Sequence, residues 1–295
     1  MTQTSDGITA YVAGGLGNQL FILGAAWEQA NRLGCPLYLD ASNFAVNKLH
    51  PYGLDSLVTP ATLLTPEQGS WRSVRVPGGR HLPIPRRLPG HVYLERSVAH
   101  YSPKVREVRP GTTLIGYFQS PLYFPTVLGA LLESLRDVPE TPEESAVLAD
   151  LRSRPAITLH LRRGDYMHAP NGKVFLATVQ YAQRAMTLLR RMDLDLPVRV
   201  FTDSVDVVRD ELGDAVADFE FIERDVPLGT VATLKAMAAG EAMIMSNSSF
   251  SWWAAMLMRS RAGAKSPIVA PRPWTMSGES RADMLGADWV TLDAR

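Results

Sequence analysis

The first 40 residues alternate between two patterns, and this alternation most restricts what the chain can fold into. A β-rich run at 8–13 precedes a glycine-containing turn at 14–18, and residues 19–33 then carry apolar side chains at helical spacing. Gly34 ends the predicted helix, and residues 36–40 have the pattern of a second strand. A helix joining two strands over such short distances forms a βαβ unit, so we predict a parallel sheet.

The second half of the chain repeats this α/β rhythm. Between the halves, residues 138–144 contain two prolines and several acids that interrupt two helical patterns, and we place the domain boundary after residue 140. The chain of 295 residues is long enough for two domains, 1–140 and 141–295, each with its own core. Two α/β domains imply a cleft in which ligands meet the carboxyl ends of the strands.

Residues 43–100 lack this regular pattern. Their most irregular part, residues 77–90, is rich in proline, glycine and arginine, and we predict a long loop there. The sequence leaves two interpretations open for this loop, a plain surface or disordered segment and a segment that binds an acceptor.

Composition excludes several classes of protein. The 30 basic and 30 acidic side chains balance, which argues against a nucleic-acid partner. One cysteine, Cys35, excludes an internal disulfide and a cysteine-based zinc site. No apolar run approaches the roughly 20 residues that span a bilayer, and the first residues lack the layout of a signal peptide. We therefore expect a cytoplasmic protein without a transmembrane segment; the sequence does not indicate its oligomeric state.

The glycine-containing turn is the first candidate site. Gly15, Gly17 and Asn18 lie where backbone can approach a ligand and where the following helix offers free N–H groups to an anion. The alternative is a tight turn in which Asn18 only caps the helix.

Two adjacent arginines, Arg162 and Arg163, follow the predicted strand 157–161 and precede Gly164. Arginines at a strand end are costly to bury unless they meet an anion, and a diphosphate matches their forked donors. Asp165 could orient one arginine or act as a base. The alternative is an ordinary surface pair.

Two further motifs follow strands. Asp203 could accept hydrogen bonds from a purine or a ribose, or it could cap the next helix. The serine-rich segment 246–251 could donate to phosphate, or it could only cap its helix. We expect Trp252 and Trp253 to belong to the core.

Asp193 and Asp195 form a DxD pattern, which holds a divalent ion in many sugar-nucleotide enzymes. Here the pattern precedes the predicted strand 198–202 and therefore lies away from the carboxyl ends of the strands. We predict a solvated loop and no metal. Motifs of zinc proteases, serine hydrolases and P-loop kinases do not occur in the sequence.

Taken together, the motifs resemble one family. They are GGLGNQ at 14–19, GYFQSPLYF at 116–124, HLRRGDY at 160–166, FTDS at 201–204 and SNSSFSWW at 246–253. In the same order and over nearly the whole chain, they resemble those of the bacterial α-1,2-fucosyltransferases, glycosyltransferase family 11. The resemblance implies a GT-B-type fold of two Rossmann-like α/β domains facing across a cleft. The first domain would face a glycan acceptor, and the second would bind GDP-β-L-fucose. It also implies inverting transfer to a galactose 2-hydroxyl, without a metal or other cofactor.

The resemblance also implies roles for individual residues. Arg162 and Arg163 would hold the β-phosphate, His160 would line the guanosine site, and Asp203 would bind the base. Asn18 would face the donor across the cleft. From the motifs themselves, we expect Asn18, Arg162, Arg163 and Asp165 to form the catalytic set. The remaining residues expected at the GDP-sugar are Gly15, Gly17, Asn247, Ser248, Ser249 and Phe250.

The sequence departs from the family pattern at two places. Residues 20–24 replace an aromatic pair, and Thr233 stands in a segment where the family carries an acid. These departures leave open an alternative function, transfer of another nucleotide-linked deoxysugar to a different acceptor, such as a small natural product.

Overall fold

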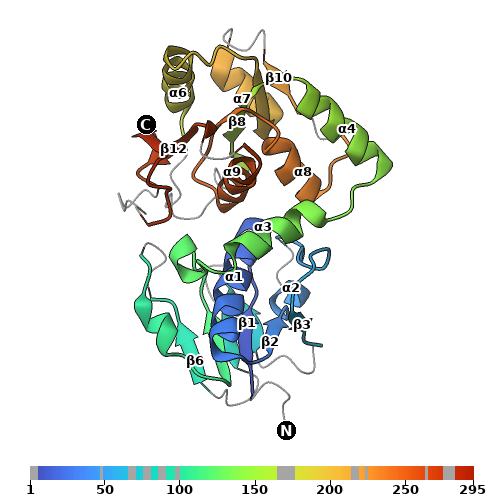
Figure 1. Cartoon of the computed structure of the whole chain (residues 1–295), viewed down its shortest axis with the longest axis vertical. Helices are drawn as coiled ribbons and strands as arrows, with labels where there is room; N and C mark the ends of the chain where they lie inside the picture. Colours follow the sequence, from blue (N-terminus) through green and yellow to red (C-terminus); the bar gives the residue numbers. More distant parts are fainter. Residues whose placement is uncertain are drawn as a thin grey trace. The chain divides into compact units, whose positions relative to one another are not determined.

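The computed structural model divides the chain into two compact units, Met1–Val138 (unit 1) and Pro139–Arg295 (unit 2) (Figure 1). The division falls in the same proline- and acid-rich segment in which the sequence places it after residue 140. The structure describes residues 6–46, 49–65, 71–75, 81–85, 91–96, 100–164, 177–213, 219–222, 225–262, 265–274 and 283–295.

Unit 1 contains a five-stranded sheet in the order β3-β2-β1-β7-β6, and every neighbouring pair is parallel. This confirms the predicted parallel sheet. Its strands are β1 (Ile8–Tyr11), β2 (Leu37–Asp40), β3 (Ala61–Leu63), β6 (His91–Leu94) and β7 (Thr112–Ile115).

The first helix of unit 1, α1 (Leu16–Leu33), begins three residues before the predicted start and ends at Gly34, whose φ of 62° suits glycine. It packs closely on the chain after β7: a Cβ at Gly24 would lie 2.8 Å from the Phe124 ring, which meets Phe21 edge-on at 5.7 Å. The other helices of this unit are α2 (Asn43–Val46), the 3-10 helices η1 (Pro103–Glu107) and η2 (Pro121–Tyr123), and α3 (Leu128–Asp137).

The expectation of a loop throughout 77–90 is wrong. Strands β4 (Trp71–Arg75) and β5 (His81–Pro85) pair antiparallel, with Trp71 opposite Pro85 and Arg75 opposite His81. Proline is tolerated because each strand of a two-stranded sheet has one free edge. The rest of the expected loop, 77–80 and 86–90, lies outside the described residues.

Unit 2 contains a six-stranded parallel sheet in the order β10-β9-β8-β11-β12-β13. All five residues of β8 are buried, as expected for a central strand of a parallel sheet. The strands are β8 (Ile157–Leu161), β9 (Val198–Thr202), β10 (Glu220–Phe221), β11 (Ala242–Ile244), β12 (Ile268–Arg272) and β13 (Val290–Asp293).

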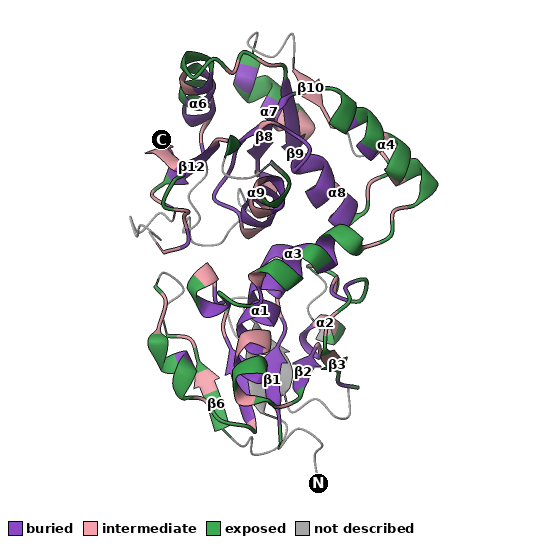
Figure 2. Ribbon diagram, in the orientation of Figure 1, coloured by how far each residue is buried: buried purple, intermediate pink, exposed green. Residues whose placement is uncertain are grey.

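Helices flank this sheet, and their burial differs (Figure 2). Figure 2 shows α9 largely buried and α4 largely exposed. Trp252 and Trp253 of α9 are buried and meet edge-on at 5.1 Å, which confirms their predicted place in the core. The helices are α4 (Pro142–Ser153), α6 (Val179–Arg191), α7 (Val205–Leu212), α8 (Thr230–Met237) and α9 (Ser249–Ala262).

The acidic segment at the start of unit 2 attaches α4 to α8. Thr141 and Glu144 form a capping box that starts α4. The Gly229 N–H donates to the other Glu144 carboxylate oxygen at 2.8 Å, and the buried Lys235 ammonium lies 2.9 Å from Glu140. Two parallel α/β units confirm the predicted GT-B-type fold class, whereas their facing across a cleft stays a prediction. In the described chain, no helix has the length and apolar character to cross a membrane.

Candidate functional site

Three neighbouring strands of unit 2 carry the polar motifs at their carboxyl ends. In the order β9-β8-β11, Asp203 follows β9, Arg162 and Arg163 follow β8, and the serine-rich segment follows β11. Because the strands are parallel, these ends lie at one edge of the sheet. The structure therefore brings motifs far apart in the sequence into one region of unit 2.

Asp203 organises the turn after β8. One carboxylate oxygen accepts from the backbone N–H groups of Arg163 at 2.8 Å and Gly164 at 3.0 Å. The other lies 3.8 Å from Arg162 Nε and would lie only 2.5 Å from a Cβ at Gly164, so this turn requires glycine. Ser204 holds the N-cap position of α7, and therefore the alternative that Asp203 caps this helix is wrong. Its contact with a base stays a prediction.

Arg163 is buried, with 2% of its surface exposed, and its guanidinium is surrounded by acceptors. Nε and NH2 lie 2.8 Å and 2.7 Å from Glu211 Oε2, on α7. NH1 donates to the carbonyls of Arg162 and Ala177, each at 3.1 Å. The interpretation of a plain surface arginine is wrong for Arg163. Its contact with a phosphate stays a prediction, but the structure shows an anionic partner from the chain itself.

Arg162 is the more accessible arginine, with 23% of its side chain exposed against 3% for Arg163. Its Nε faces Asp203 at a distance of an ion pair rather than a close hydrogen bond. The two adjacent arginines therefore have different surroundings. Glu211 holds Arg163 in the interior, whereas Arg162 is partly exposed at the carboxyl ends of the strands.

His160 connects β8 to the serine-rich segment. Its Nδ1 shares a hydrogen bond with Ser251 Oγ and lies 3.4 Å from Ser246 Oγ. Burial, with a smaller contribution from the Arg162 charge, lowers the pKa of His160 from 6.5 to about 3. The imidazole is therefore neutral at physiological pH. The Phe250 ring lies 6.5 Å from it, and the role of both residues at a guanosine stays a prediction.

The serine-rich segment caps α9, as one of the two interpretations predicts. Ser248 Oγ accepts from the Phe250 N–H at 3.2 Å, and Asn247 Nδ2 donates to the Trp274 carbonyl at 3.2 Å. Ser249 is the first residue of α9 and, like Phe250, is partly exposed. The predicted contacts of Asn247, Ser248, Ser249 and Phe250 with a GDP-sugar stay predictions.

The glycine turn of unit 1 is built from backbone. Gly14 has a φ of +78°, and Gly15 is the N-cap of α1 without a side-chain capping bond. The alternative that Asn18 caps the helix is therefore wrong, since Asn18 lies in the first turn. Its Oδ1 accepts from Gln119 Nε2 at 2.6 Å, which joins two of the motifs. The roles of Gly15, Gly17 and Asn18 toward a donor stay predictions.

Gln19 fixes this turn to the loop at 51–53. Its buried amide donates to the carbonyls of Gly14 and Pro51, each at 2.8 Å, and accepts from the Gly53 N–H at 2.9 Å. All three partners are backbone groups, so the amide supplies hydrogen bonds that the turn could not make alone.

The DxD pattern lies between α6 and β9, as the sequence predicts. Asp195 is 84% exposed and pairs with Arg190 at 3.3 Å. Within the described ranges, no group of three or more His, Cys, Asp and Glu side chains is arranged to hold a metal ion. Asp165, predicted as a catalytic residue, lies outside the described residues.

Three residues that contact the predicted site residues were not predicted. Gln119, the partner of Asn18, belongs to the 116–124 motif, and Ser251, the partner of His160, belongs to the 246–253 motif, but the sequence did not indicate these contacts. Glu211 belongs to no motif. The sequence indicated only that a buried arginine needs an anionic partner, and we expected that anion to be a ligand rather than Glu211.

Two parallel α/β units, with polar residues gathered at the carboxyl ends of one sheet, form the GT-B-type architecture. The sequence model of glycosyl transferase family 11 matches residues 112–292. The chain belongs to this family and is a glycosyltransferase.

Similar proteins span nearly the whole chain. An Escherichia coli alpha-1,2-colitosyltransferase is 25% identical over 97% of this chain and 99% of its own. The E. coli O-antigen biosynthesis glycosyltransferase WbnK is 20% identical over 95% and 99%. Among solved structures, the fucosyltransferase NodZ from Bradyrhizobium is similar with a TM-score of 0.47 and 15% identity, covering 85% of this chain and 92% of that one.

Proposed function

We propose that this glycosyltransferase moves L-fucose from GDP-β-L-fucose to the 2-hydroxyl of a galactoside, with inversion and without a metal ion. The observation that carries the proposal is the partly exposed Arg162 at the carboxyl edge of the unit 2 sheet, in a chain of family 11. Its fork of donors at a strand end fits the diphosphate of a nucleotide sugar.

In this proposal, Arg162 and the start of α9 bind the diphosphate. The first N–H groups of a helix and its dipole favour an anion, and Ser249 stands at that position. Arg163 supports the site indirectly, because its charge is already matched by Glu211 and its carbonyl contacts hold the turn on which Arg162 stands.

Asp203 and His160 would form the nucleoside side of the site. An ionised carboxylate has about four acceptor positions, and Asp203, at the carboxyl end of β9, would accept hydrogen bonds from the N–H groups of guanine. His160 is neutral and buried and therefore adds no second positive charge near the base.

The reaction would be a displacement at the anomeric carbon through an oxocarbenium-like state. The bond from the sugar to the diphosphate breaks, and GDP departs with its electron pair. The acceptor oxygen forms the new bond from the opposite face, and its proton passes to water. Arg162 would stabilise the charge that develops on the departing phosphate. We assign Asp165 to orienting the arginines because it follows Arg162 and Arg163 closely in the sequence, and a carboxylate that pairs with a guanidinium is a weak base. Asn18 would act from unit 1.

Two observations favour a second candidate for the donor sugar. At Thr233, in the segment where the family carries an acid, the hydroxyl donates to the Gly229 carbonyl of its own helix at 2.9 Å. A relative named for the transfer of colitose, a sugar that lacks the 3-hydroxyl of fucose, is 25% identical. Another deoxysugar is therefore the second candidate for the donor.

Calorimetry and a transfer assay test the proposal. We expect GDP to bind more tightly than UDP, ADP or dTDP, and we expect GDP-fucose to be consumed only when a galactoside such as lactose is present. Preference for GDP together with turnover of GDP-colitose alone would favour the alternative donor. Preference for UDP or dTDP, or no turnover of any GDP-sugar, would overturn the assignment.

A further inference from the structure

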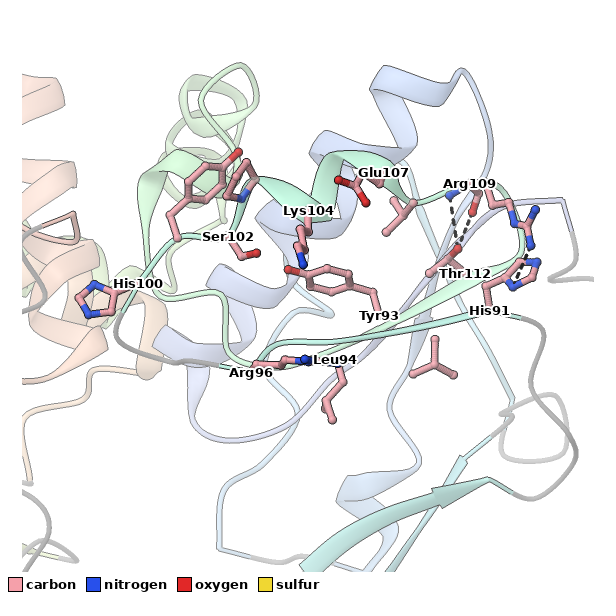
Figure 3. A pocket seen from close by; sticks show the side chains of 14 residues that line it. His91, Tyr93, Leu94, Arg96, His100, Ser102, Lys104, Glu107, Arg109 and Thr112 are labelled. Carbon is pink, nitrogen blue, oxygen red and sulfur yellow. Dashed lines mark hydrogen bonds between the residues drawn. The ribbon is translucent and has the colours of Figure 1, made fainter.

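Unit 1 contains a cavity of about 690 Å³ beside its edge strand β6 (Figure 3). Its walls come from β6, from η1 and from the segment leading to β7. The volume lies within the roughly 300–1,000 Å³ of small-molecule sites and is far larger than one phosphate needs. None of the sequence motifs contributes a residue to this cavity.

The charged side chains that line the cavity are mostly cationic. Arg96, Lys104 and Arg109 contribute to the lining, and Glu107 is the one carboxylate among the residues that line it. Within the described part of the chain, neither Arg96 nor Lys104 forms an ion pair, and Arg109 donates to His91 Nδ1 at 3.2 Å. An excess of unmatched positive charge in a concave surface favours an anion.

The cavity also has an aromatic wall. Figure 3 shows Tyr93 extending into the space between β6 and η1, on the side from which Lys104 approaches. The Tyr93 ring stacks on Phe118 with centroids 6.2 Å apart, and this contact fixes its orientation. A fixed ring beside cationic groups suits a ligand that combines C–H faces with negative charge, as an acidic sugar does.

The shape of the cavity suits a chain rather than a compact ion. Figure 3 shows Arg109 and His100 at opposite ends, with Lys104 between them. His91 begins β6, whereas Arg96 follows its carboxyl end. Because β6, β7 and β1 are parallel, this second end belongs to the sheet edge that also carries Asn18 and Gln119.

We propose that this cavity binds an anionic segment of the acceptor glycan, in which sugar residues carry carboxylate or phosphate groups. That this glycan is the acceptor rests on the proposed function, but the binding of an acidic glycan to the cavity can be tested without turnover. Lys104 would contribute the central contact, and Tyr93 would support a sugar ring.

The test compares two charge reversals on η1 in the full chain at low ionic strength. Lys104→Glu changes the cavity, whereas the matched control Arg106→Glu changes an exposed residue of the same helix that does not line it. The probes are a galacturonate tetrasaccharide, its carboxyl-reduced neutral counterpart and inorganic pyrophosphate, each titrated by calorimetry with GDP saturating so that the donor site is filled.

We expect an anionic probe to bind the original chain and Arg106→Glu equally, and to bind Lys104→Glu at least about tenfold more weakly, the loss of one charge-assisted contact. Dependence on Lys104 with galacturonate assigns the charge to sugar carboxylates, and with pyrophosphate to phosphate groups. Equal affinities of the two variants for both anions, or equal binding of the neutral tetrasaccharide, would overturn the proposal. Failure of GDP to bind would instead overturn the proposed function. The anionic probes would then be titrated in the absence of GDP, and the comparison of Lys104→Glu with Arg106→Glu would still test the cavity.

Discussion

The turn after β1 and the turn after β8 occupy equivalent places, each at the carboxyl end of a central parallel strand, but they are built differently. The first uses neutral groups: Gly14 adopts a positive φ, and Gln19 ties backbone to backbone. The second uses charge: Asp203 holds two N–H groups, and Glu211 holds Arg163. Amides can fix a turn without adding a net charge, whereas ion pairs also determine which charge remains partly exposed, here that of Arg162.

Removal of Arg162 should have the largest effect on this comparison. We expect Arg162→Ala to lower kcat by about 10³-fold or more, because an arginine that meets developing phosphate charge can contribute that much. Arg162→Lys should not restore the rate, since a point charge lacks the fork. Initial rates with GDP-fucose measure both, with Arg190→Ala as the control. Near-normal turnover of Arg162→Ala would show that the turn after β8 does not stabilise the departing diphosphate.

Arg163 should affect folding instead. We expect Arg163→Ala to lower the free energy of unfolding by about 3–5 kcal/mol, the range for breaking a buried pair. Glu211→Gln should cost less, because Glu211 is 35% exposed and water can partly replace it. Urea denaturation measures these changes, and Arg162→Ala should leave stability nearly unchanged. A stable Arg163→Ala chain that no longer binds GDP would show that Arg163 contacts the ligand itself.

The neutral turn has its own test at Gln19. We expect Gln19→Leu to lower the free energy of unfolding by about 2 kcal/mol, because three backbone groups lose their partner and only some regain it from water. Gln29→Leu is the matched control on α1: Gln29 is also buried, but its bond comes from the Arg32 side chain. Thermal and urea unfolding measure both variants. If Gln19→Leu and Gln29→Leu lost the same free energy of unfolding, burial of the amide rather than its bonds to the turn would determine the loss.

The charged turn should also respond to pH through His160. Above pH 6.5 the imidazole is neutral in both the folded and the unfolded chain. Between pH 6.5 and about 3 the unfolded chain binds a proton that the folded chain refuses, so stability falls as pH falls. The slope is at most about 1.4 kcal/mol per pH unit.

Denaturation at several pH values between 7 and 4 measures this contribution. His160→Gln should flatten the acid decline, because glutamine does not titrate but can still bond with Ser251. His100→Gln is the control, since His100 is exposed. An unchanged slope in His160→Gln would show that the buried imidazole accepts a proton in the folded chain.

Hydrophobic periodicity was sufficient to predict that both sheets are parallel and to locate their inner strands, because buried parallel strands and their crossover helices produce strong local patterns. It missed the edge strands β3, β6 and β13. It was also insufficient for the β4–β5 hairpin, because β5 contains two prolines, Pro83 and Pro85, which are typical of loops rather than strands. The start of α1 was placed too late, because Gly15 begins the helix through its backbone and gives no side-chain signal.

For the candidate site, the sequence correctly grouped residues at strand ends, because parallel topology determines which ends meet. It could not show that Arg163 has an internal partner, since Glu211 is one unremarkable acid on α7. The cavity beside β6 was also unpredictable, because its cations occur singly between residues 91 and 109 and meet only through the fold.

The smallest expected effect concerns metal ions. With Glu211 neutralising Arg163, the case for metal independence rests on Arg162 and the start of α9, together with the position of the DxD pattern. Asp193 and Asp195 precede β9, at the edge opposite Asp203, and Asp195 pairs with Arg190 in solvent. Transfer should therefore persist in excess EDTA, and the Asp193→Ala/Asp195→Ala variant should retain most of its activity. If EDTA abolished transfer and Mn²⁺ or Mg²⁺ restored it, the partly exposed Arg162 and the start of α9 would be insufficient to neutralise the diphosphate, and the site would need a divalent cation.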